Sequence, residues 1–277
     1  MDWRCSMLDN IVLVSHSEAH SLPNLGREAD VLEGEGPLSY DAIMDAIRGA
    51  SQSLGVGGKT PSAGRAYKLI STIEFIPDEG RYHYDGHRVC GVRLHPRETF
   101  KRGGKCPKCN RPVTVGVLSR VEKLADRALP QKPKGAPGFL GVVELDKIIA
   151  DSLGIKSRKS KAVEKIFWDM LAHAPELDIL VDYPIERIRK IASPVVAEAI
   201  SRMRAGKIRI DPGYDGAYGV IHLFGDHERN DKKQAVFFHS PGFKIFSGWK
   251  IMSIIPIVFF RQACVSCLTL GLKSKKV

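Results

Sequence analysis

The first half of the chain sets short apolar runs between polar and glycine-rich stretches. Such runs predict strands at 8–14, 72–76 and 113–118. A further strand-like piece follows Glu28, and Ser39 is expected to be the N-cap of a helix that runs to Arg48. A short basic helix is expected over 119–127. This half therefore mixes strands with short helices.

In the second half the apolar spacing becomes helical. One helix face carries Leu145, Ile148, Ile149 and Leu153, and that helix is expected to end at Gly154. The same spacing predicts helices at 163–171, 185–191 and 195–203, and a strand is expected at 220–224. A proline- and glycine-rich loop or hinge at 130–138 separates the two patterns. Together they predict an α+β fold.

Composition narrows the class of protein. The chain has 277 residues and a formal net charge of +11, with a pI near 9.4. Its length predicts two or three small domains, and its charge favours a polyanionic partner. A ribosomal or membrane-surface role would give the same charge. Six cysteines without the density of a disulfide scaffold, and no signal peptide, predict a cytoplasmic location.

A glycine-rich stretch has the spacing of a metal knuckle. Cys106 and Cys109 form a C-x-x-C pair, and His87 and Cys90 repeat that spacing upstream, with fifteen residues between Cys90 and Cys106. Two such half-sites provide the four ligands that tetrahedral zinc requires. His83 is an alternative to His87 as the fourth ligand. We expect a structural zinc site without an open coordination position.

A second place for a metal follows the first predicted strand. Glu18 and His20, at spacing i and i+2, project to the same side of an extended segment. A carboxylate and an imidazole on one side form part of a divalent-metal site. The alternative is a polar loop that binds nothing.

Two segments are candidates for contact with nucleic acid. The turn between the helices at 145–153 and 163–171 carries Lys156, Ser157, Arg158, Lys159 and Lys161. Charges and hydroxyls at a helix N-terminus can hold a phosphate backbone. The alternative is a solvated turn that contacts no nucleic acid. The glycine-rich loop 211–219 adds Tyr214 and Tyr218. These rings would stack on an unstacked base or pack on the helices.

Several motifs carry a resemblance to a known family. They are Thr72–Phe75, Glu79–Arg88, the Cys106–Cys109 knuckle, Val115–Leu118 and Pro212–Gly216. In these stretches the chain resembles the endonuclease Q proteins of archaea and bacteria, from residue 8 to 225 apart from 52–71. The resemblance implies a DNA repair endonuclease with a PHP metallohydrolase domain, a zinc module and a helical C-terminal domain. It also implies nicking on the 5′ side of uracil, hypoxanthine, xanthine or an abasic site.

The resemblance assigns a role to the N-terminal residues as well. Ser17–Ser21 matches the closing metal motif of the PHP domain, with Glu18 in place of an aspartate. Residues 1–50 then correspond to the last part of that domain only. A complete site would hold Mg²⁺, Mn²⁺ or Zn²⁺ with ligands from a separate PHP-domain chain, and we do not expect this chain to hydrolyse DNA alone. The alternative is a non-catalytic, zinc-dependent nucleic-acid-binding protein.

The expected organisation follows from these assignments. It comprises a PHP remnant (1–50), a linker or insertion (51–71), a zinc module (72–127), a helical DNA-binding domain (128–224) and an atypical tail (225–277). The linker holds Gly55–Thr60, which lacks the first glycine of a phosphate loop. In the tail, Lys233–Phe238 faintly resembles a sliding-clamp peptide, and an apolar run at 251–260 is interrupted by polar residues and proline. No membrane span is expected.

Overall fold

The computed structural model describes residues 1–21, 24–55, 67–225, 228 and 254–255. The α-helices are α1 (Tyr40–Ser53), α2 (Pro96–Lys101), α3 (Val117–Leu124), α4 (Leu145–Leu153), α5 (Lys161–Leu171), α6 (Glu176–Val181), α7 (Ile185–Ile191) and α8 (Pro194–Arg204). The strands are β1 (Ala29–Gly34), β2 (Tyr67–Phe75), β3 (Asp85–His87), β4 (Val92–Leu94), β5 (Gly138–Val142), β6 (Arg209–Asp211), β7 (Val220–His222) and β8 (Ile254–Ile255). Short 3-10 turns are η1 (Asp2–Arg4), η2 (Ser6–Leu8), η4 (Pro77–Glu79) and η5 (Arg88–Cys90). The α+β fold expected from the sequence is confirmed.

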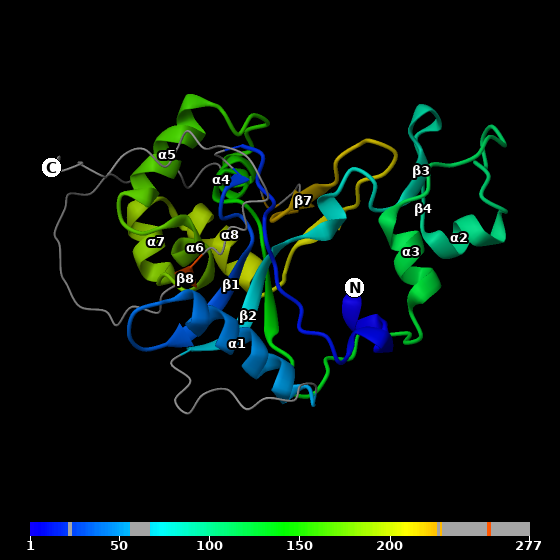
Figure 1. Cartoon of the computed structure of the whole chain (residues 1–277). Coiled ribbons are helices and arrows are strands. Elements are labelled where there is room, and N and C mark those ends of the chain that lie inside the picture. Colours follow the sequence, from blue (N-terminus) through cyan, green and yellow to red (C-terminus); the bar gives the residue numbers. More distant parts are fainter. Residues whose placement is uncertain (22–23, 56–66, 226–227, 229–253, 256–277) are drawn as a thin grey trace, which may run out of the picture.

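A central sheet joins two groups of smaller elements (Figure 1). Its strand order is β5-β2-β1-β8, with β2 antiparallel to β1 and parallel to β5. Helices α4 to α8 gather at one end of the molecule, and β3, β4, α2 and α3 lie at the other (Figure 1). The hairpin of β6 and β7 leads from the helices towards the group of β3, β4, α2 and α3. The loop between β6 and β7 can therefore reach that group.

The main core lies between the sheet and the helices. Ile73 on β2 is fully buried with Ile148 on α4, Val163 on α5 and Ile200 on α8, all in one cluster. This burial uses the helical spacing seen in the sequence, which places one apolar stripe of each helix inward. A separate small cluster around Cys106 contains only Val92, Leu94 and Val113 as its other buried members. So small a core needs a cross-link to be stable.

Helix ends follow the expected chemistry. The Ser39 side chain accepts from the N–H of Ala42, which makes it the predicted N-cap, although α1 continues to Ser53. Helix α4 ends as predicted, because Gly154 adopts a left-handed conformation with φ of 65°. Helix α6 and the two ends of β2 were not anticipated, since β2 begins at Tyr67 rather than at Thr72 and ends at Phe75.

Two strand predictions are wrong. Residues 8–14 form no strand; in the described sheet the neighbours of β1 are β2 and β8. Residues 113–118 contribute one isolated bridge, between Thr114 and Gly86. The N–H of Gly116 then donates to the Asp85 carboxylate over 2.7 Å, and α3 begins at Val117. The ladder ends there because a side chain has taken the next donor.

Several sequence hypotheses lie outside the described residues. They concern the segment Gly55–Thr60 beyond its first residue, the sliding-clamp-like Lys233–Phe238 and most of the apolar run at 251–260. Among the helices that the structure does describe, none is both long and apolar enough to cross a membrane.

Candidate metal centre and the loop beside it

Three thiols and one imidazole converge at the tip of the β3–β4 hairpin. His87 ends β3, Cys90 closes the turn η5, and Cys106 and Cys109 flank a turn on the neighbouring segment. One ligand atom from each lies within 4.8 Å of the other three. Three thiolates with one histidine nitrogen form a donor set typical of tetrahedral structural zinc, so these residues fit the ion that the sequence predicts.

A residue in the left-handed backbone conformation follows a ligand cysteine in each half-site and turns the chain there. Gly91, directly after Cys90, has φ of 62°, and Asn110, directly after Cys109, has φ of 59°. Asn tolerates this region better than most residues that have a side chain. The Lys108 ammonium donates to the Cys90 carbonyl over 2.9 Å, which ties one half-site to the other.

The thiols differ in how readily they lose a proton. Burial opposes ionisation of Cys106, but the N–H groups of Lys108 and Cys109 outweigh it and lower the pKa of that thiol to about 6. Hydrogen bonding to Cys109, together with burial, raises the pKa of Cys90 to about 11. The Cys109 Sγ and His87 Nδ1 atoms are 3.4 Å apart. Cys106 is therefore the thiol of the cluster that most readily places negative charge on sulfur, as a metal ligand requires.

His83, the alternative fourth ligand, is not part of this group. Its side chain is buried, and its Nε2 lies 3.3 Å from Asp78 Oδ1. The largest effect on the pKa of Asp78 is the hydrogen bond from His83, which lowers it. His87 is the histidine that the structure places with the cysteines.

A buried carboxylate supports the knuckle from behind. Asp85 is fully buried; its Oδ1 accepts from the Gly116 N–H at 2.7 Å and from the Ser119 hydroxyl at 2.8 Å. Gly86 and Thr114 exchange two backbone hydrogen bonds, of 2.9 and 2.8 Å. These contacts fix the segment before His87 to the segment after Cys109.

The loop 211–219 is attached to the knuckle. The Tyr84 N–H donates to the Gly213 carbonyl at 2.9 Å, and a Cβ on Gly86 would lie 2.3 Å from Tyr214 Cδ2. Asp215, with φ of 44°, accepts the Arg88 N–H at 2.5 Å and the Thr114 hydroxyl at 2.6 Å. The N–H of Arg88, and then the Thr114 hydroxyl, lower the pKa of Asp215. Sequence reasoning missed Asp215, for which its place in an Asp-Gly turn gave only a turn signal.

The two tyrosines of this loop have different environments. Tyr214 is half-buried and packs against Gly86 of β3, on the knuckle rather than on the helices. Tyr218 is 72% exposed, with the Arg81 guanidinium 5.2 Å from the centre of its ring. Only Tyr218 leaves a ring available to a ligand.

The basic turn between α4 and α5 is exposed at Lys156, Lys159 and Lys161. Its hydroxyl at Ser160 is used within the chain, where it caps α5 by accepting from Val163. Arg158 is also occupied, with Nη1 3.2 Å from Glu144 Oε1 and 3.4 Å from Asp146 Oδ1. The lysines and Ser157 remain the candidates for phosphate contact.

Glu18 and His20 do not have the expected geometry. Glu18 has φ of 42°, so the segment is not extended there, and both side chains are exposed. Among the described residues, the potential metal ligands that converge on one point are those of the cysteine–histidine knuckle, and neither Glu18 nor His20 belongs to it. Any role of this pair in a metal site therefore needs partners beyond the described residues.

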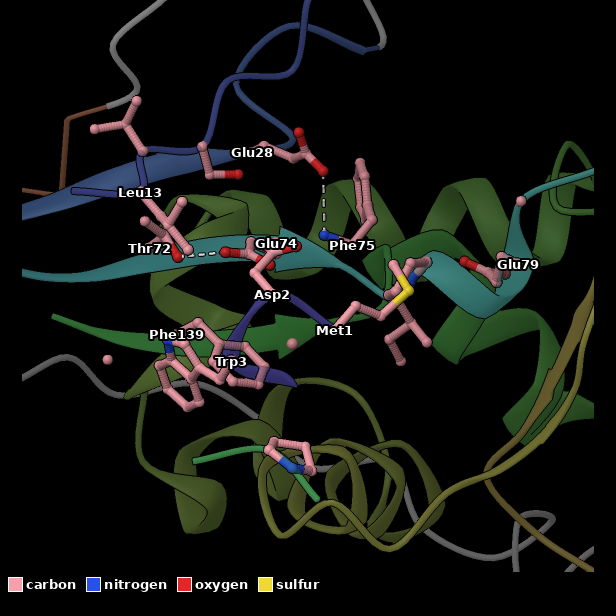
Figure 2. A pocket seen from close by; sticks show the side chains of 18 of the residues that line it. Met1, Asp2, Trp3, Leu13, Glu28, Thr72, Glu74, Phe75, Glu79 and Phe139 are labelled. Carbon is pink, nitrogen blue, oxygen red and sulfur yellow. Dashed lines mark hydrogen bonds between the residues drawn. The ribbon is translucent and has the colours of Figure 1, made fainter. Parts of the chain in front are cut away.

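A groove of about 1280 Å³ runs beside the N-terminal segment and the sheet (Figure 2). Glu28, Glu74 and Glu79 line it, and Trp3 and Phe139 meet edge to face at 5.2 Å on its apolar side. Burial raises the pKa of Glu28 and of Glu79. Lys147, Arg158 and, from the loop 211–219, Tyr218 line it as well, so its wall carries charges of both signs and reaches the loop beside the knuckle.

Fold and site define an α+β protein whose cysteine–histidine knuckle is joined to a helical part by one loop. Residues 144–207, which contain α4 to α8, match the family described as the MJ0043 C-terminal domain. The chain is 32% identical to the uncharacterized protein MJ0043 of Methanocaldococcus jannaschii over 217 residues, which is 77% of this chain and 26% of that protein. It is 23% identical to the uncharacterized protein YqxK of Bacillus subtilis, over 78% of this chain and 48% of that protein.

Two solved structures extend these matches. One is the lesion-specific endonuclease PfuEndoQ from Pyrococcus furiosus, with 30% identity, a TM-score of 0.66, and coverage of 83% of this chain and 56% of that one. The other is endonuclease Q in complex with a 27-mer duplex that has an abasic lesion at the active site, with 30% identity, a TM-score of 0.64, and coverage of 82% and 54%. The resemblance seen in the sequence is confirmed, and the chain is endonuclease Q-like. It spans about half the length of these structures and a quarter of MJ0043.

Proposed function

We propose that this chain is the DNA-holding part of an endonuclease Q-like repair enzyme. The observation that carries the proposal is 30% identity and a TM-score of 0.66 to a lesion-specific endonuclease over 83% of the chain. The duplex with an abasic lesion in the related complex supports DNA as the partner. The complete enzyme would nick DNA on the 5′ side of uracil, hypoxanthine, xanthine or an abasic site.

The knuckle has a structural part in this proposal. His87, Cys90, Cys106 and Cys109 would hold one zinc ion, which supplies a cross-link in place of a large core. Zinc fits better than Mg²⁺ or Ca²⁺, because thiolates are soft ligands and those ions prefer oxygen. The residues themselves fix the hairpin β3–β4 against the segment that leads into α3.

Hydrolysis needs ligands in addition to Glu18 and His20. A divalent ion, Mg²⁺, Mn²⁺ or Zn²⁺, would activate water and offset charge on the phosphate. Two exposed side chains on a turn are too few to hold and orient such an ion, so the remaining ligands would come from a PHP domain beyond the described residues, for instance on a separate chain. By itself this chain would bind lesion-containing DNA without nicking it.

The test uses the purified chain with duplexes that contain deoxyuridine, deoxyinosine or an abasic-site analogue, each beside an intact duplex. Fluorescence anisotropy should show binding, and gels after incubation with Mg²⁺, Mn²⁺ or Zn²⁺ should show no nicks. Adding a PHP-domain chain should restore nicking on the 5′ side of the lesion. Rapid, metal-dependent nicking by the chain alone would contradict the proposal that a PHP domain must complete the catalytic site. Absence of DNA binding would contradict the proposed function itself.

A second function is favoured by one observation: the metal group found in the described residues is rich in cysteine and suits a structural ion. The chain would then be a zinc-dependent nucleic-acid-binding protein without a catalytic partner. In that case no PHP-domain chain restores nicking, although DNA is still bound.

A further inference from the structure

Three long side chains meet over one turn of the loop 211–219. A Cβ placed on Gly216 would lie 3.6 Å from the Tyr82 hydroxyl, 3.8 Å from Arg88 Nη1 and 4.0 Å from Arg81 Nη2. The Arg81 guanidinium lies 5.2 Å from the ring centre of Tyr218. We call Arg81, Tyr82, Arg88 and Tyr218 the arginine–tyrosine surface.

This surface is exposed although its backbone is firmly held. Tyr218 is 72% exposed and Tyr82 is 49% exposed. Beneath them the Gly216 N–H donates to the Arg81 carbonyl at 3.0 Å, and Arg81 Nε donates to the Gly216 carbonyl at 3.1 Å. Two exposed tyrosine rings beside two guanidinium groups on a fixed turn form a surface that suits a ligand with an aromatic face and negative charge.

Its positive charge is not consumed by salt bridges within the described part of the chain. Neither Arg81 nor Arg88 forms an ion pair there, whereas Arg158 and Arg202 each pair with carboxylates. Asp215 lies beneath Arg88, but its two oxygens accept from the Arg88 N–H and the Thr114 hydroxyl. The two guanidinium groups can therefore meet an anion from solvent.

We propose that the arginine–tyrosine surface binds an unpaired nucleotide of a DNA strand. Tyr218, held from one side by Arg81, offers its ring to an unstacked base, and Arg88 contacts the adjoining phosphate. A fully paired duplex offers no free base face, so the contact with Tyr218 favours DNA that has an unpaired base. The contact of Arg88 with a phosphate is the same in paired and unpaired DNA. This inference rests on the proposed function and names the residues that favour a disrupted duplex.

The test compares two labelled duplexes, one fully paired and one with a single unpaired adenine, bound to the full chain. Stacking of one base strengthens binding roughly 5- to 150-fold, so wild type should prefer the bulged duplex by a factor in that range. Tyr218→Ala and Tyr218→Leu should abolish the preference. Arg88→Ala should weaken both duplexes alike, because a phosphate contact does not depend on pairing.

Tyr40 provides a matched control. It is 71% exposed on α1, outside the proposed surface, and Tyr40→Ala should keep the preference of wild type. Retention of the preference in both Tyr218 variants, or its equal loss in Tyr40→Ala, would overturn the inference and leave the proposed function intact. Equal binding of both duplexes by wild type would do the same. Failure of wild type to bind either duplex would overturn both proposals.

Discussion

At the scale of single residues, function depends on side chains whose roles are set by their partners. Cys5 and Cys106 are both buried, at 4% and 2% exposed, yet only Cys106 lies with other metal-binding groups. Cysteine spacing predicted that difference. The half-site spacing also predicted His87 over His83, which the structure places with Asp78 instead. The partners of Asp215 and Arg158 could not be predicted, because each contact crosses between segments that are distant in sequence.

The first prediction concerns the metal. Purified protein should contain one zinc per chain, and Cys106→Ser and Cys109→Ser should each lose it, because a hydroxyl is a far weaker zinc ligand than a thiolate. Elemental analysis with a zinc-binding dye measures the content. Cys5→Ser is the matched control and should keep the ion. Unchanged zinc in both knuckle variants would refute the site.

The second prediction concerns pH. The Arg4 side chain, and then Arg97, lower the pKa of Glu122 from 4.5 to about 2, while burial opposes the shift. A carboxyl whose pKa falls on folding stabilises the protein above its unfolded pKa and loses that effect as it is protonated. Glu122 therefore stabilises the fold at neutral pH, and this contribution disappears as the pH falls from about 4.5 towards 2.

Glu122→Gln provides the measurement. Urea unfolding at pH 7 should show the variant less stable than wild type, and the difference should shrink steadily below pH 4.5. Glu186→Gln is the control, since the Glu186 carboxylate is 73% exposed and its partner in the described part of the chain is Arg189, one helical turn away. A difference between Glu122→Gln and wild type that persists unchanged at pH 3 would contradict the assignment.

At the scale of elements, the sequence specified helices better than strands. Caps such as Ser39 and Gly154 are local signals, so α1 begins and α4 ends where expected. A strand exists only if a partner edge is free, which depends on the whole sheet. Residues 8–14 have the composition of a strand but do not join the sheet, whereas β5 arises at the end of a predicted loop because it pairs with β2.

The third prediction concerns the turn between α4 and α5. Replacing Lys156 and Lys159 with alanine should weaken DNA binding. It should also reduce the slope of log K against log salt by about 0.9 for each phosphate of duplex DNA that the variant no longer neutralises. Arg158→Ala should change the slope less, because Arg158 already pairs with Glu144 and Asp146. Anisotropy titrations at several salt concentrations decide this.

The control for this pair is Lys68→Ala with Lys190→Ala, which removes the same charge from exposed positions on β2 and α7. Its slope should stay near that of wild type. If both double variants lower the slope equally, the turn acts only through net charge and holds no phosphate.

At the scale of the whole molecule, the knuckle and the helical part are joined by the loop 211–219. Gly86 and Arg88 flank His87 and contact Tyr214 and Asp215 of that loop, respectively. The ion would therefore do more than stabilise a small module. By fixing the segment around His87, it would also fix the turn that presents Tyr218. The link between the knuckle and the loop could not be predicted from the sequence, because more than one hundred residues separate Arg88 from Asp215.

The last prediction tests that coupling. Removing the metal with a chelator should free the segment around His87, so the Asp215 contacts weaken and Tyr218 no longer stays beside Arg81. Wild type should then lose its preference for an unpaired base. In Tyr218→Leu, which lacks the preference already, chelation should change the ratio of the two affinities very little. Anisotropy of the bulged and paired duplexes, with and without chelator, completes a four-part cycle. If the preference survives in metal-free wild type, the loop is held without the ion. If it disappears in wild type while the ratio in Tyr218→Leu stays constant, the metal acts through this one loop.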